Sequence, residues 1–152
     1  MGYYIRNYLN KLQGCFFKVY NILGFGHKEV AYQRALEQEL TLQNIPFEKE
    51  TRLPITYKGK KIAEYVPDLV IDNKIIVEIK ALEFLPNKFI TQIIYYLKGT
   101  DYQLGYLVNF GSPRLEIIRR IWTPPIRGNS LPIRGNSNPI SIPGNPSSPR
   151  FP

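Results

Sequence analysis

Residues 66–80 read Val66-Pro67-Asp68-Leu69-Val70-Ile71-Asp72-Asn73-Lys74-Ile75-Ile76-Val77-Glu78-Ile79-Lys80. The two apolar segments favour β-strands, and the polar residues 72–74 between them favour a turn. Three charged side chains, Asp68, Glu78 and Lys80, interrupt the apolar runs. Charge inside a buried strand is costly unless it is paired or bound to a metal. The stretch therefore predicts two adjacent strands that carry a chemical site.

The pairing register of these strands decides whether the two acids meet. Side chains alternate along a strand, so Glu78 and Lys80 share one face of theirs. If the turn has three residues, Ile71 pairs with Ile75 and Asp68 lies directly opposite Glu78, with Cβ atoms about 5 Å apart. A two-residue turn would shift Asp68 by one position and separate the acids. The predicted site thus depends on a three-residue turn.

Two carboxylates this close repel each other unless a positive charge lies between them. A hard divalent cation suits the pair, with Mg²⁺ preferred for phosphate chemistry and Mn²⁺ also suitable. Such an ion lowers the pKa of a bound water and polarises a phosphodiester. Lys80 would orient the attacking water or stabilise charge in the transition state. Spacing alone leaves an alternative open, in which Lys80 neutralises one acid in a structural ion pair at a sheet edge.

Hydrophobic periodicity predicts the remaining elements. Helices are expected at about residues 3–23, 28–43 and 86–98. Strands are expected at residues 53–57, 61–71, 75–79, 104–110 and 115–122. The order α-α-β-β-β-α-β-β indicates a mixed α/β fold layered around one sheet.

Composition limits the partners. The chain has 152 residues, a net charge of +8 and a pI near 9.6, which suits a polyanion such as nucleic acid or an anionic membrane surface. No apolar run reaches the roughly 18 residues that a membrane span needs. The one cysteine, Cys15, excludes an intramolecular disulfide and a multi-thiolate zinc site. We therefore expect a reducing, cytoplasmic setting and no membrane partner.

The chain divides near Trp122 into a domain at residues 1–122 and a tail at residues 123–152. The tail holds eight of the thirteen prolines, no acidic residue and a near-perfect repeat, Pro125–Ser130 followed by Pro132–Ser137. Such composition cannot bury enough apolar surface to offset chain entropy, so the tail is expected to be disordered. It would be either a weak nucleic-acid tether or a dispensable extension.

Several short motifs carry a family resemblance. Gly26–Tyr32 has the form G-x-x-E-x-x-Y. It is followed by Ala35–Leu40, Tyr57–Lys61, Asp68-Leu69, Val77–Ala81, Gln92 with Tyr96–Lys98, and Val108–Gly111. In this order the motifs resemble the GxxExxY protein family, small bacterial and archaeal proteins placed in the PD-(D/E)xK nuclease superfamily. The resemblance covers about residues 16–122.

The resemblance implies a restriction-endonuclease-like core, a mixed central β-sheet flanked by helices. It matches Asp68, Glu78 and Lys80 to the superfamily's catalytic triad. Glu29 matches a position for an additional acid, so Asp68, Glu78 and Glu29 would hold Mg²⁺ or Mn²⁺. Gln92 matches a polar residue on the helix that follows the acid-x-lysine strand. Two alternatives remain open, because Glu29 also suits a helix start and Gln92 could be a solvated helix residue.

The expected function is therefore Mg²⁺-dependent phosphodiester hydrolysis through a metal-activated water, with nucleic acid, above all DNA, as the substrate. The alternative is a catalytically inactive module on a nuclease fold that binds nucleic acid or protein. A homodimer is left open. Tyr95 departs from the family pattern, which has a polar residue before Tyr96, and this would alter substrate contacts without touching the triad.

Overall fold

The computed structural model describes residues 2–125, and the tail predicted to be disordered lies, from residue 126 on, outside the described residues. Three helices are formed, α1 (Gly2–Leu23), α2 (Glu29–Leu42) and α3 (Asn87–Gly99). The strands are β1 (Phe47–Glu48), β2 (Leu53–Tyr57), β3 (Lys60–Tyr65), β4 (Leu69–Ile71), β5 (Ile75–Lys80), β6 (Leu104–Asn109) and β7 (Glu116–Ile121). Helix and strand positions agree closely with the sequence prediction at α1, α2, β5, α3, β6 and β7.

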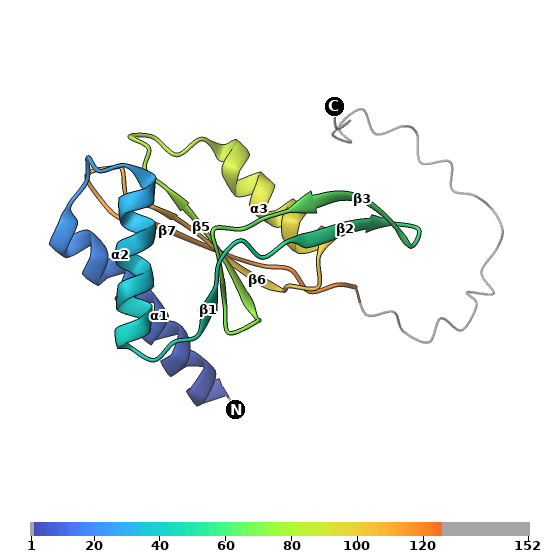
Figure 1. Cartoon of the computed structure of the whole chain (residues 1–152), viewed down its shortest axis with the longest axis horizontal. Helices are drawn as coiled ribbons and strands as arrows, with labels where there is room; N and C mark the ends of the chain where they lie inside the picture. Colours follow the sequence, from blue (N-terminus) through green and yellow to red (C-terminus); the bar gives the residue numbers. More distant parts are fainter. Residues whose placement is uncertain (1, 126–152) are drawn as a thin grey trace.

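Five strands form one sheet in the order β1-β4-β5-β6-β7, with β5 in its centre (Figure 1). The pair β5–β6 is parallel and the other pairs are antiparallel. Helix α3 makes the crossover between the two parallel strands, as such a connection requires. The prediction of a mixed α/β fold is confirmed.

The sheet is covered on both faces by apolar side chains. On one face, Phe16 of α1 and Leu36 of α2 belong to the same buried cluster as Val77 and Ile79 of β5. On the other face, Ile93 of α3 packs in a second cluster that includes alternate strand residues and the base of the β2–β3 hairpin. Since side chains alternate along β5, its even-numbered residues face α3.

The predicted strand at residues 61–71 is wrong as a single element. Strand β3 ends at Tyr65 and pairs only with β2, in a separate two-stranded sheet. Strand β4 starts at Leu69 and joins the main sheet. Pro67 stands between them, and because proline has no N–H to donate to a ladder, it favours a break at this point. The two-residue strand β1 was not predicted, and the expectation of a single sheet was wrong as well.

The predicted register of β4 against β5 is confirmed. Ile71 pairs with Ile75, and the Lys74 N–H donates to the Ile71 carbonyl at 2.9 Å. The turn between them has three residues, of which Asp72 and Asn73 adopt the left-handed conformation with φ of 50° and 52°. Aspartate and asparagine tolerate this conformation better than other residues with a Cβ. The last pair of the ladder is Leu69 with Val77. Asp68 and Glu78 come one position beyond it, so this register places them opposite each other.

Asn109 ties the end of β6 to its neighbours. The side chain is fully buried, and its Oδ1 accepts a hydrogen bond from the Leu82 N–H at 2.9 Å. Its Nδ2 donates to the Leu82 carbonyl at 2.9 Å and to Glu116 Oε1 at 2.8 Å. Asn109 thus fixes the segment that follows β5, and with it the end of the strand that carries Glu78 and Lys80.

We predict that Asn109→Ala lowers the free energy of unfolding by about 2–4 kcal/mol, because it leaves the partly buried N–H and carbonyl of Leu82 without their partner and removes one of the hydrogen bonds to Glu116. Urea unfolding followed by circular dichroism measures the change. The control Asn10→Ala alters an exposed helix residue and is expected to shift stability by less than about 0.5 kcal/mol. Equal stabilities for the two variants would contradict this role of Asn109.

Candidate functional site

Asp68, Glu78 and Lys80 lie together where β4 begins and β5 ends. All three side chains are partly buried, and Glu78 and Lys80 lie on the face of β5 that is turned toward α3. Strand β5 is the central strand of the five, so this cluster is not at a sheet edge. The grouping has the composition that the sequence predicted, two acids and one lysine.

Asp68 is held by the backbone beside it. Its Oδ2 accepts a hydrogen bond from the Ile79 N–H at 2.7 Å. Gln33 of α2 donates to the Asp68 carbonyl at 3.5 Å. Burial raises the pKa of Asp68, while the Ile79 hydrogen bond and the charge of Lys80 lower it. The carboxylate is therefore fixed in position but only partly compensated.

Glu78 carries the most perturbed carboxylate. Burial and, secondly, the negative charge of Asp68 raise its pKa to about 7 from the ordinary value of 4.5. The Tyr65 hydroxyl donates a hydrogen bond to Glu78 Oε1, which lowers this pKa, as does the charge of Lys80. The stabilising contacts of the Glu78 carboxylate do not offset its burial and the charge of Asp68. Such a carboxylate favours binding either a proton or an additional cation.

Lys80 is shared among the acids rather than paired with one. Among residues 2–125 it forms no salt bridge, and its ammonium lies 4.6 Å from the centroid of the Phe89 ring. Its positive charge nevertheless lowers the pKa of Asp68, Glu78 and Glu29. A structural ion pair between Lys80 and one acid, the alternative left open by spacing, is therefore not formed in this structure.

Glu29 approaches the same group from α2, of which it is the first residue. Burial raises its pKa, the Lys80 charge lowers it and the Asp68 charge raises it. Glu29 is thus close enough to the cluster to feel both charges. Its position in the first turn of α2 also suits the helix dipole. Glu29 can therefore act both as an additional acid near the site and as a favourable residue at the helix start.

Gln92 does not contact the acids directly. It is exposed on α3 and donates a hydrogen bond to the Tyr96 hydroxyl at 2.8 Å. Tyr96 stacks on Tyr65 with ring centroids 3.4 Å apart and planes inclined by 9°, and Tyr65 binds Glu78. Sequence reasoning missed Tyr65. The only signal in the sequence was an aromatic residue three positions before Asp68.

The donor chemistry of the cluster fits a magnesium-like ion. Mg²⁺ is usually bound by one or two carboxylates and keeps several waters, which matches Asp68 and Glu78. The raised pKa of Glu78 indicates uncompensated negative charge that a divalent cation would offset. Within residues 2–125 no three or more histidine, cysteine, aspartate or glutamate side chains are arranged around one metal position. In this conformation Glu29 is therefore a neighbour of the carboxylate pair.

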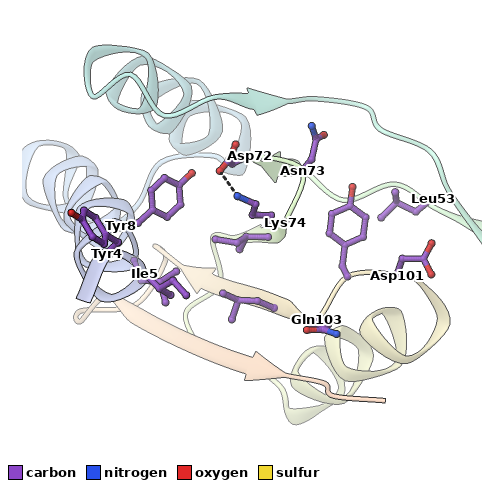
Figure 2. Close-up of a pocket in the computed structure, with 13 residues that line it drawn as sticks. Tyr4, Ile5, Tyr8, Leu53, Asp72, Asn73, Lys74, Asp101 and Gln103 are labelled. Carbon is purple, nitrogen blue, oxygen red and sulfur yellow. Dashed lines mark hydrogen bonds and ion pairs between the residues drawn. The ribbon is translucent and has the colours of Figure 1, made fainter. Parts of the chain in front are cut away.

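A large pocket lies away from the acidic cluster. It has a volume of about 1060 Å³, and its lining includes Ile75, the first residue of β5, whereas Glu78 and Lys80 lie toward the other end of that strand. Figure 2 shows the pocket, whose other lining residues are Tyr4, Ile5, Tyr8, Leu9, Leu53, Asp72, Asn73, Lys74, Asp101, Tyr102, Gln103 and Leu104. The pocket is mostly apolar and aromatic, and its lining does not include Asp68, Glu78 or Lys80.

Comparison with known proteins identifies the superfamily of the chain. A sequence model described as the PD-(D/E)XK nuclease superfamily matches residues 6–121. The chain belongs to the PD-(D/E)XK nuclease superfamily. No curated protein and no solved structure gives a significant match. The superfamily predicted from the motifs is confirmed, and the GxxExxY family within it stays a prediction.

Membership of the PD-(D/E)XK nuclease superfamily supports a nuclease-like function and binding of nucleic acid. Nucleases of this superfamily generally use divalent metal ions. None of the helices within residues 2–125 is long and apolar enough to cross a membrane.

The pKa of Glu78 predicts a pH dependence of stability in the metal-free protein. Between pH 4.5 and about 7 the folded state holds a proton that the unfolded state has released. The free energy of unfolding therefore falls as pH rises through this range, by on the order of 3 kcal/mol from this group. Thermal melts in EDTA measure the effect, which should shrink in Glu78→Gln and persist in the exposed control Glu83→Gln. An identical pH profile in all three proteins would contradict it.

Proposed function

We propose that this PD-(D/E)XK domain hydrolyses phosphodiester bonds in nucleic acid, with DNA as the substrate and Mg²⁺ or Mn²⁺ as the cofactor. Asp68 and Glu78 would bind the ion. Glu29 would act as the additional acid beside it. The observation that carries the proposal is the grouping of these partly buried acids around Lys80, which forms no salt bridge within residues 2–125, in a chain that belongs to a nuclease superfamily.

The residues of the site would divide the chemistry among them. A bound divalent ion would supply a water of lowered pKa and a polarised phosphodiester. Lys80 would orient the attacking water and stabilise the negative charge that develops on the phosphate oxygens. Its approach to a phosphate is eased because no carboxylate of the described residues holds its ammonium in a salt bridge.

The tyrosines would support the carboxylates. Tyr65 donates to Glu78 and would hold that side chain in one rotamer. Gln92 would act through Tyr96, whose ring stacks on Tyr65. Gln92 is therefore assigned as a positioning residue, in place of the direct role that the family resemblance implied.

We predict that Asp68→Asn and Glu78→Gln each reduce Mg²⁺-dependent cleavage of plasmid and linear DNA by at least about 100-fold, since each removes a metal-binding charge. EDTA should abolish cleavage by the unaltered chain. Glu83→Gln, which changes an exposed acid close in sequence to β5, is the matched control and should cleave normally.

Cleavage that persists unchanged in Asp68→Asn would reject this site. The absence of cleavage by the unaltered chain with Mg²⁺ and Mn²⁺, together with retained binding of nucleic acid, would favour the inactive binding module instead.

A further inference from the structure

The β2–β3 hairpin projects from the domain (Figure 1). Leu53 and Tyr65 pair at its base and are buried in the cluster beneath α3. Farther out, Ile55 packs close to Gly99 at the end of α3. Beyond this anchor, residues 56–62 are all exposed. The hairpin is therefore an arm with a fixed base and a tip that contributes nothing to the core.

The tip carries concentrated positive charge. Lys58, Lys60 and Lys61 lie within four positions, and no acidic residue occurs in residues 53–63. Glu64, nearer the base, pairs with Lys61 at 2.6 Å and with Arg52 at 2.7 Å. Lys58 and Lys60 form no salt bridge with any residue of the described chain. Two lysines at the end of the arm are thus available to anions.

The arm also presents apolar surface. Tyr57 and Ile62 are 60% and 61% exposed at the tip. The pairing skips Ile62, because Ile55 pairs with Ala63 and Thr56 pairs with Lys61. Such a bulge strengthens the twist of a two-stranded ribbon and redirects the side chains beyond it. Exposed apolar groups among lysines suit a partner that offers both phosphates and base edges.

We propose that the β2–β3 hairpin inserts as a β-ribbon into the major groove of double-stranded DNA. The major groove of B-form DNA, about 12 Å wide, admits a two-stranded β-ribbon. The major groove of double-stranded RNA is too deep and narrow for side chains to read, and a single strand has no groove. Lys58 and Lys60 then contact phosphates on the groove walls. This inference rests on the proposed function for its substrate class and narrows that class to duplex DNA.

The base of the arm is joined to the acidic cluster. Tyr65, the last residue of β3, donates to Glu78. Lys60 lies five positions before Tyr65 along β3, so at about 3.3 Å per residue the tip lies about 16 Å from the cluster. This is about half of a helical turn of DNA, which measures roughly 34 Å. If the tip lies in the major groove, the sugar-phosphate backbone about half a helical turn farther along the duplex would therefore lie close to Asp68 and Glu78.

Binding of a fluorescently labelled duplex by the full chain in EDTA tests the arm without any cleavage. We expect Lys58→Ala/Lys60→Ala to weaken binding roughly 10- to 30-fold near 0.15 M salt and to reduce the salt slope by roughly 2, as for two lost phosphate contacts. The control Lys11→Ala/Lys18→Ala removes two exposed lysines of α1, and its affinity should change less than about twofold. Circular dichroism melts of both variants confirm that they fold.

Competition with single-stranded DNA and double-stranded RNA of the same sequence tests the commitment to duplex DNA. Tighter binding of duplex DNA that depends on Lys58 and Lys60 supports the proposal. Equal affinity for the RNA duplex or the single strand, or equal loss in the two double variants, overturns it. If duplex binding depends on Lys58 and Lys60 but no metal-dependent cleavage occurs, the proposed hydrolase function is rejected and the proposed DNA-binding role of the arm is supported. Cleavage with arm-independent binding would reject the arm alone.

Discussion

The pairing of Ile71 with Ile75 is the constraint on which the site depends. It is set by a three-residue turn whose first two residues, Asp72 and Asn73, are left-handed. A slip of one residue would turn Asp68 to the other face of the sheet and leave Glu78 without a second acid. The turn lies at the far end of β4 and β5 from the cluster. The backbone conformation of the turn at residues 72–74 therefore determines whether Asp68 and Glu78 lie opposite each other.

The electrostatics of the cluster follow from that register. Asp68, Glu78 and Glu29 are all pushed toward the protonated form by burial, and Lys80 offsets this only partly. The ionised form of these carboxylates is therefore unfavourable in the folded protein, and a bound divalent cation would stabilise it. Perturbed carboxylates of this kind concentrate at functional sites.

The register and the shared face of Glu78 and Lys80 could be predicted from sequence, because both depend on local patterns within residues 66–80. The role of Tyr65 could not be predicted from sequence. It depends on the β2–β3 hairpin, which is separate from the main sheet and whose last residue, Tyr65, contacts Glu78. The break at Pro67 was visible in the sequence but was outweighed by the apolar run around it. Likewise the indirect placement of Gln92 depends on the stacking of two tyrosines from different elements, a tertiary contact without a sequence signature.

A crystal of the full chain soaked in Mn²⁺, measured where manganese scatters anomalously, tests most directly whether the paired carboxylates form a metal site. We expect an anomalous peak at about 2.1 Å from an oxygen of Asp68 and of Glu78, the distance at which Mg²⁺ binds oxygen. The peak should vanish in Asp68→Ala. A peak only elsewhere in the molecule, or one at this position that survives Asp68→Ala, would contradict a metal centre built on the Asp68–Glu78 pair.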